Sequence, residues 1–593
     1  MKKIVKYIIL SSLMAFALCS CDEYLSTDVT SEFNEYWTWT NAEKSGGTLV
    51  YIYRSLGENP DAYDGNFLDV ATDNAYSRLV SSSAYLMGHG YCTSVSNPID
   101  IWNGMYTNIQ SINMFLEKGL TDDVVYSISN EETNAATKKR MKGEAYFLRA
   151  YCGFKLLQMY GGKAADGKVY GYPIMTSYEG PEQTAHVTDY VRNSYESCVD
   201  QIVRDCETAM ENLPLLYTGS DGVTGASQVG RASGLAAAAL KVKVLVYAAS
   251  PANQPDDIVK INGMGDYTIV NQVAYKAKWE RAARYADEVL NLSQMGSFKA
   301  LNLAELSDAT SPTDEFLFRH YVGNGHGVED RQYPPSYYGA AQTVPSENLV
   351  EAFPSLTGYP ITDPRSGYDP GNPYVLKRDK RFEMNVFYHG RTFGKHTTAI
   401  DVSEGGKDSF LYSPNASATG YYLGKFINVS KDKFLTPLEQ QSTIHFNPYL
   451  RKAEVWLNFA EAANEAWGPS SAPGCKYTAY DVIKEIRKTS GGISDVTYLN
   501  EMAADPVLFR GLIQNERRLE LAFENQRYWD LRRWLMPLSV TIQGMSVKKD
   551  GESTTYQVVD VERRTLNDVR YYYHPLPYSE VRKNPNLVNN LGW

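Results

Sequence analysis

The chain lacks the sequence motifs by which the commoner catalytic sites are recognised. Its 593 residues contain no G-x-S-x-G nucleophile turn, no H-E-x-x-H zinc motif and no EF-hand loop. The segment Gly162 to Lys168 resembles a phosphate-binding loop, but Val169 stands where Ser or Thr must reach Mg²⁺. We therefore predict a protein that is not an enzyme and that carries no cofactor.

Cysteine, histidine and net positive charge are also scarce. The seven cysteines and eight histidines are scattered, without a C-x-x-C pair or a cluster at metal-ligand spacing, so no metal site is indicated. The formal net charge of −11 argues against a nucleic-acid partner, because phosphate binding needs a basic surface. Beyond residue 20, no apolar run is long enough to span a bilayer.

What the N-terminus does contain is a secretion signal. Three lysines precede a short apolar run from Ile8 to Leu18, which is typical of a signal peptide. The ending Leu-Cys-Ser-Cys resembles a bacterial lipobox, so we expect residues 1–20 to be removed and Cys21 to be lipidated. Residues 21–40 would then tether the chain to the outer membrane. The two acids after Cys21 resemble the surface-export signal of Bacteroides-type lipoproteins, which predicts exposure on the cell surface.

Tyrosine is unusually abundant, with 45 copies. Its ring offers a flat apolar face and its hydroxyl a polar edge. Such a surface suits sugars, which are apolar on the ring face and polar around it, and peptides can use it too. The composition therefore favours a binding protein whose ligand is a sugar or a peptide.

Helical periodicity dominates two parts of the chain, residues 41–294 and 449–593. Apolar residues recur at helical spacing in the segments 41–56, 101–118, 134–160, 191–213, 231–249, 274–290, 449–467 and 477–488. Ala and aromatic residues at the expected helix contacts are similar to tetratricopeptide units, although long loops make the spacing irregular. We predict an all-α dominated fold built on a degenerate helical array.

Between these two parts, residues 295–448 lose the helical pattern and are rich in Gly, Pro, Tyr and Asn. An irregular insert of this length inside a compact chain is usually functional or disordered. Its aromatic content argues against disorder. We therefore expect the insert to be loop-rich and to contribute to a ligand-binding face.

The segment Gln514 to Trp534 combines one apolar stripe with two acids four positions apart, Glu516 and Glu520. Glycoside hydrolases use two carboxylates, so a catalytic pair is one interpretation. Five arginines in the same segment favour a buried ion network instead, because buried carboxylates need cationic partners. We assign this structural network to Glu516, Arg517, Glu520, Glu524, Arg527 and Asp530.

Several segments recur in an order that one protein family shares. After the lipobox they read I-W-N-G-M-Y-T-N-I-Q-S-I-N, G-E-A-Y-F-L-R-A-Y, A-E-V-W-L-N-F-A-E-A, N-E-R-R-L-E-L-A-F-E-N-Q-R-Y-W-D-L-R-R-W and the terminal N-P-N-L-V-N-N. Each segment alone is weak evidence, but the ordered set covers nearly the whole chain and is highly specific. The chain resembles the SusD/RagB family, the surface lipoproteins of Bacteroidetes nutrient-uptake systems.

The resemblance implies an all-α core of about four tetratricopeptide-like helix pairs with a large, mostly irregular, loop-rich remainder. It implies no catalysis. Family members capture an oligosaccharide and act as a lid that delivers it to a TonB-dependent, SusC-like outer-membrane transporter, whereas RagB-like relatives carry peptides. We therefore predict a glycan-binding protein, with a peptide-binding protein as the alternative. A glycoside hydrolase and a docking subunit without its own ligand remain open.

Part of the ligand site can be placed on this resemblance. T-D-N-A-Y-S-R, from Thr72 to Arg78, matches the family's segment before the first long loop, which makes Asp73 and Arg78 candidate hydrogen-bonding residues. Further candidates come only from the aromatic composition of the loops: Tyr85, His89, Tyr91, Tyr321, Tyr333, Tyr337 and Tyr338. We expect about half of the tyrosines to fill loop cores, as amphipathic aromatics often do, and Trp102 to be a core residue.

Overall fold

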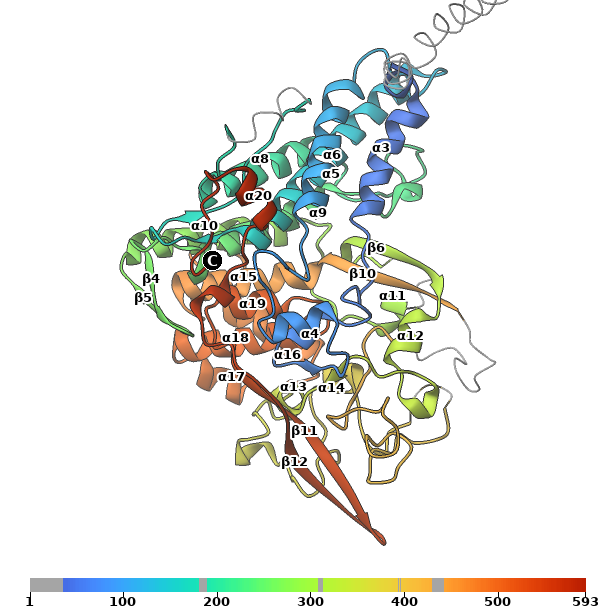
Figure 1. Ribbon diagram of the computed structural model, residues 1–593, viewed down its shortest axis with the longest axis vertical. Coiled ribbons are helices and arrows are strands. Elements are labelled where there is room, and N and C mark those ends of the chain that lie inside the picture. The colour runs from blue at the N-terminus through green and yellow to red at the C-terminus, as the bar shows by residue number, and fades with distance from the viewer. Residues whose placement is uncertain (1–35, 181–188, 308–312, 393, 395, 429–441) are drawn as a thin grey trace, which may run out of the picture.

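The computed structural model describes residues 36–180, 189–307, 313–392, 394, 396–428 and 442–593 (Figure 1). The signal segment, Cys21 and most of the tether lie outside the described residues. The last residues of the tether, 36–40, are helical, and Trp39 packs against the main hydrophobic core. Among the helices that the structure describes, none combines the length and apolarity needed to cross a membrane.

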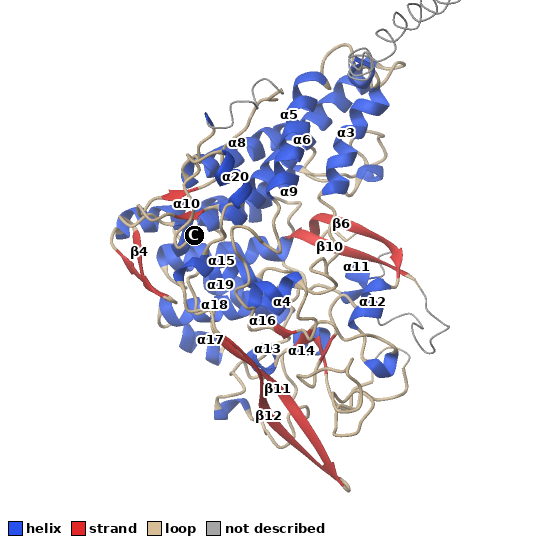
Figure 2. Cartoon of the chain, in the orientation of Figure 1, coloured by secondary structure: helices blue, strands red, loops and turns tan. Residues whose placement is uncertain are grey.

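Helices that pack in sequence order make up the larger part of the molecule (Figure 2). After α3 (Ala42–Ser55) come four contacting pairs: α5 (Trp102–Lys118) with α6 (Glu131–Tyr160), α8 (Tyr195–Asn212) with α9 (Gly234–Ala249), α10 (Gln272–Leu290) with α15 (Lys452–Trp467), and α16 (Ala479–Thr489) with α18 (Pro506–Glu520). Further contacts of α6 with α8, α9 with α10 and α15 with α16 join the pairs. The predicted tetratricopeptide-like core is confirmed.

Local sequence explains where these helices begin and how closely they pack. Asn130, Ser194 and Ser233 cap α6, α8 and α9, because each side chain accepts a backbone N–H of the first turn. α9 is buried on all sides, since its run of small residues lets α8, α10 and α15 approach its backbone. The array therefore has one continuous core, which residues before 300 and after 449 share.

The insert separates the two helices of one pair. α10 ends at Leu290 and α15 begins at Lys452. The chain enters the insert along β6 (Phe316–Gly325) and returns along β10 (Thr443–Arg451). The two strands form an antiparallel pair, in which Arg451 lies opposite Phe316. The insert is thus attached to the array at the start of α15.

Short elements hold the insert around a second, aromatic core. They are α11 (Leu303–Ser307), α12 (Gly327–Gln332), α13 (Glu347–Ala352), α14 (Lys380–Asn385), β7 (Val344–Pro345), β8 (Val386–Phe387) and β9 (Tyr422–Leu423). Phe67 from the N-terminal part and Phe523 from the C-terminal part are buried in the same core. β1 (Ala75–Tyr76) pairs with β7, so the first long loop and the insert form one unit. The loop-rich remainder is confirmed.

The C-terminal part differs from the sequence prediction at two points. The helix expected from Tyr449 begins at Lys452, because the residues before it complete β10. The apolar stripe from Gln514 to Trp534 is not one helix, since α18 ends at Glu520 and α19 spans Arg527–Arg533. Phe523 and Asn525 lie between them with φ values of +60° and +59°, which no helix accommodates.

The longest pair of strands, β11 (Val540–Asp550) with β12 (Ser553–Arg564), was not predicted from the sequence. The two strands form a long antiparallel hairpin that projects from the body (Figure 1). The sequence signal for this hairpin was the dipeptide Asp550-Gly551, which stands between two segments of alternating side chains. Gly551 adopts φ +60° at the turn. The remaining elements are α4 (Ser83–Gly88), α17 (Thr497–Met502), α20 (Tyr578–Lys583), β2 (Gly162–Lys163), β3 (Val169–Tyr170), β4 (Val259–Gly263) and β5 (Asp266–Ile269).

Candidate functional site

A row of three aromatic rings lies on and just after α4. Ser82 caps this helix by accepting the N–H of Tyr85 at 3.3 Å. The His89 ring stacks on Tyr85, with ring centroids 3.8 Å apart and planes inclined by 19°. Tyr91 continues the row, 6.4 Å from His89 at the same inclination. The structure therefore brings three of the predicted candidates together in one nearly parallel stack.

The inner part of this row is held by polar contacts of His89. His89 Nδ1 lies 2.8 Å from the Tyr85 carbonyl, and its Nε2 lies 3.3 Å from the carboxylate of Glu562 on β12. Burial alone would raise the pKa of Glu562, but the hydrogen bond from His89 and the charge of Arg564 lower it. Tyr91, by contrast, is 61% exposed. The row is a fixed platform whose outer ring faces solvent.

Arg78 lies where the first long loop meets two loops of the insert. Its guanidinium donates to the carbonyl of Ala340 at 3.2 Å and to the carbonyl of Pro414. Tyr338, in the first of these insert loops, is 48% exposed and adopts φ +64°. Arg78 and Tyr338, two further candidates, thus belong to neighbouring segments of one exposed region.

Sequence reasoning missed three exposed apolar residues in the second insert loop. Phe410, Leu411 and Tyr412 are 52%, 77% and 64% exposed. Asp408 anchors this loop by accepting the N–H of Ser336 at 2.8 Å. The available signal was the apolar triplet in S-F-L-Y-S-P, because large apolar side chains that stay exposed side by side mark interaction sites.

We use the name aromatic face for two groups of side chains, the row on α4 and the loops around Arg78 that carry Tyr338 and the triplet of residues 410–412. It offers ring faces for stacking and a guanidinium for hydrogen bonding. Within the described residues of the whole chain, no group of three or more His, Cys, Asp or Glu is placed to hold a metal ion. The chemistry of the aromatic face is that of binding.

The other candidate tyrosines lie elsewhere. Tyr333 and Tyr337 are each 1% exposed, and their hydroxyls donate to backbone carbonyls of the insert at 3.0 and 2.7 Å. Both rings fill the second core. Tyr321 is half exposed on β6, where its ring packs edge-on against Phe446 of β10. Tyr321 therefore lies on the β6–β10 strand pair and not on the loops around Arg78.

Asp73 is held by internal cations. Its carboxylate lies 2.9 Å from the guanidinium of Arg527 and 3.1 Å from that of Arg518. Burial would raise the pKa of Asp73, but the two guanidiniums outweigh it and hold the pKa well below its usual range. Of the two hydrogen-bonding candidates taken from the family resemblance, Arg78 is the one that reaches the exposed loops.

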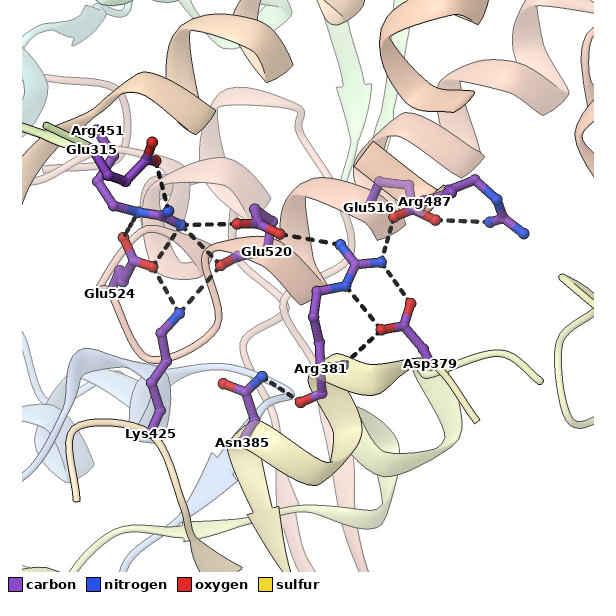
Figure 3. A network of polar contacts seen from close by, with 10 residues as sticks. All are labelled: Glu315, Asp379, Arg381, Asn385, Lys425, Arg451, Arg487, Glu516, Glu520 and Glu524. Atoms are coloured by element: carbon purple, nitrogen blue, oxygen red, sulfur yellow. Dashed lines mark hydrogen bonds and ion pairs between the residues drawn. The ribbon is translucent and has the colours of Figure 1, made fainter. Parts of the chain in front are cut away.

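The paired carboxylates of α18 are buried among arginines (Figure 3). Glu516 lies 2.6 Å from Arg381 and 2.7 Å from Arg487, and Glu520 lies 3.3 Å from Arg451. The cavity beside Glu520 measures about 20 Å³, which is room for one water molecule and not for a sugar ring. The geometry is that of an ion network and does not present these carboxylates to a substrate.

The other residues assigned to this network are also ion-paired. Arg517 lies 2.8 Å from Asp530, Glu524 lies 2.7 Å from Lys425, and Arg527 pairs with Asp73. Most further members of the network come from other elements and were missed in the sequence. They are the cations Arg381, Lys425, Arg451 and Arg487, and the acids Glu454, which pairs with Arg517, and Glu315, which pairs with Arg451. The network therefore ties α18 and α19 to the insert, to β10 and to α15.

Comparison with known proteins points to one family along most of the chain. The model of the SusD family matches residues 315–593, and a model described as starch-binding associating with outer membrane matches residues 43–241. SusD-like protein P25 of Formosa agariphila is 20% identical, over 99% of this chain and 98% of its own length.

Solved structures share the fold. A SusD-like protein from Bacteroides fragilis matches with a TM-score of 0.69 at 22% identity, covering 94% of this chain and 98% of its own. A SusD-like carbohydrate binding protein from the same species gives a TM-score of 0.66 at 22% identity, covering 93% and 100%. Because the two family models together match residues 43–241 and 315–593, the chain belongs to the SusD/RagB family.

Proposed function

We propose that the protein is a non-catalytic glycan-binding lipoprotein of the cell surface, which captures an oligosaccharide on the aromatic face. It then acts as a lid that delivers the glycan to a SusC-like TonB-dependent transporter. The family description supports a carbohydrate ligand and outer-membrane association. The observation that carries glycan binding is the row of Tyr85, His89 and Tyr91, held at its inner end and exposed at its outer end.

The aromatic face has the physical properties that glycan capture needs. Stacked aromatic contacts contribute on the order of 1 kcal/mol each, so several rings acting together give moderate affinity. Arg78 adds hydrogen-bond donors beside them, because a guanidinium has five N–H groups and only some are used by the loop carbonyls. Moderate affinity spread over several rings suits a protein that must release its ligand to a transporter.

The absence of catalysis is supported by the place of the acids. A hydrolase needs two carboxylates beside the scissile bond, with space between them for substrate or water. Glu516 and Glu520 are instead 0% and 4% exposed and paired with arginines. The lipid anchor at Cys21 is proposed from the lipobox, and more than one acyl chain there would hold the domain stably on the membrane.

The test is affinity electrophoresis of the chain without residues 1–21 against a panel of glycans and peptides. We expect retention by one glycan class, reduced in Tyr91→Ala and in Tyr412→Ala. Tyr51→Ala is the matched control, since Tyr51 is a similarly exposed tyrosine (59%) on α3. Retention by peptides alone would contradict glycan capture and favour the peptide-binding alternative. Co-purification with a transporter without any retained ligand would favour a docking subunit.

A further inference from the structure

A cavity of about 450 Å³ lies beside α5, outside the aromatic face. One wall is the α5 surface from Trp102 to Met114, which extends over three helical turns. Opposite walls come from Pro173 and Met175 after β3 and from α20 with the residues that follow it, to Leu587. Its volume falls in the range of small-molecule sites, about 300–1,000 Å³.

The lining is mainly apolar and includes aromatic and sulfur-containing side chains. The rings of Trp102 and Tyr106 lie 4.9 Å apart and are inclined by 52° to each other. Met114, Met175 and Leu587 add flexible apolar surface, and methionine sulfur makes favourable contacts with aromatic rings. A cavity of about 150 Å³ is enough to bind benzene, so this one has room for a substituted aromatic ring.

Several polar groups that line the cavity are occupied by the protein itself. The Tyr106 hydroxyl donates to the Pro173 carbonyl at 2.9 Å. Gln110 donates to the Met175 sulfur at 3.3 Å and accepts the N–H of Glu179 at 3.0 Å. At the rim, Lys583 and Glu580 pair with each other at 2.9 Å. A sugar placed inside would give up its hydrogen bonds to water without replacement, at a cost of about 1–3 kcal/mol for each unpaired group.

One loop of the chain connects the aromatic face to this cavity. The chain runs directly from Tyr91 to Trp102, and between them the Ser94 carbonyl accepts the N–H of Tyr578 at 2.8 Å. Tyr578 is the first residue of α20, whose later residues line the cavity. The loop of residues 92–101 thus connects the row in sequence to an apolar site that does not suit sugar rings.

We propose that the cavity is a binding site for an aromatic acyl group, such as a hydroxycinnamoyl ester, carried by the captured glycan. The cavity favours an aromatic ring over a sugar because of its size, its paired rings and its internally satisfied polar groups. The inference deepens the proposed function and rests on it only for the source of the aromatic group. It names a ligand feature that a panel of unsubstituted glycans would not contain.

Methyl ferulate is the probe that tests this site without a sugar. The readouts are isothermal titration and ¹³C-methyl methionine NMR, with the signals of Met114 and Met175 assigned by substitution. We expect saturable binding to the chain without residues 1–21, with shifts at both methyl groups. Thr107→Trp places a large side chain from an exposed position of α5 into the cavity and should weaken binding at least tenfold. Glu117→Trp is its control, because this exposed position on α5 does not line the cavity.

Equal affinity in Thr107→Trp and the wild type, or no binding at millimolar probe, would overturn the proposal. Thermal unfolding of both variants shows whether a lost affinity reflects a lost fold. Tyr91→Ala should lose glycan retention and keep methyl ferulate binding. Failure of glycan capture and failure of the aromatic site are thus separate outcomes.

Discussion

The ion network and the aromatic face differ in burial and in origin. The network of Figure 3 is buried, and its acids take their cations from distant segments such as β10 and the insert. The aromatic face is exposed, and its rings come from short runs of the chain, at residues 85–91 and 410–412. The residues that look catalytic in the sequence are closed off, while the rings that look like loop filling are available to a ligand.

Removing one cation from the ion network should have the largest effect on the free energy of unfolding. Arg451 is buried and pairs with Glu315, Glu520 and Glu524, so Arg451→Met leaves three carboxylates without a shared partner. We expect a loss of about 3–5 kcal/mol in the free energy of unfolding, measured by urea titration, because breaking a buried ion pair leaves uncompensated charge.

Lys548→Met is the matched control for that loss. Lys548 pairs with Glu404 at 3.1 Å on the exposed part of β11, and such pairs contribute no more than about 1 kcal/mol. If both variants unfold at the same urea concentration, the network is not a major source of stability and the contrast between the two regions fails.

The pH dependence of stability tests a second buried group, His574. His574 is buried beside Arg532 and lies 3.0 Å from the Tyr528 hydroxyl, and burial, followed by the charge of Arg532, lowers its pKa to about 3. The unfolded chain binds a proton near pH 6.5 and the folded one does not, so stability present above pH 6.5 is lost as the pH falls towards 3. This one group should cost about 2 kcal/mol between pH 7 and pH 5.

The measurement for His574 is the slope of unfolding free energy against pH. His574→Gln removes the titrating group and keeps hydrogen-bonding capacity towards Tyr528. We expect a shallower slope in the variant whatever its absolute stability. Identical slopes between pH 7 and pH 5 would show that His574 is not held neutral by its surroundings.

Asn525 ties the turn after α18 to the N-terminal part of the chain, and its replacement should have an intermediate effect on stability. It lies in the turn after α18, where its side chain donates to the Pro60 carbonyl at 3.0 Å and accepts the N–H of Leu68 at 2.6 Å. We expect Asn525→Ala to cost about 1–3 kcal/mol through these two bonds, and more through its positive φ. Asn525→Gly should recover about 1 kcal/mol, because glycine adopts that φ without strain. Equal stability of the two variants would contradict the strain component.

The sequence predicted the helical array well because helix periodicity is local. The glycine that ends α6, Gly161, acts within a few residues, whereas α6 and α8 begin at Glu131 and Tyr195 and not at the expected residues 134 and 191. The partners of Glu516 and Glu520 were not predictable, since Arg381 and Arg451 reach them only when the insert closes onto α18. The same limit applies to the candidate tyrosines, because Tyr337 is buried and Tyr338 beside it is exposed through tertiary packing that the sequence does not show.

Two tyrosines, one on the aromatic face and one in the second core, give the last and smallest stability effects and the clearest separation of roles. Tyr412→Ser should change the free energy of unfolding by less than about 0.5 kcal/mol, because the side chain is 64% exposed. It should still weaken glycan binding about fivefold, the equivalent of one stacking contact.

Tyr333→Phe should behave in the opposite way, losing about 1 kcal/mol with its buried hydrogen bond to the insert and leaving glycan affinity unchanged. Titration calorimetry with the glycan retained in electrophoresis, beside urea unfolding of both variants, measures the two effects. If Tyr412→Ser alters stability and not affinity, the triplet is a packing element and the aromatic face is limited to the row on α4 and its neighbours around Arg78.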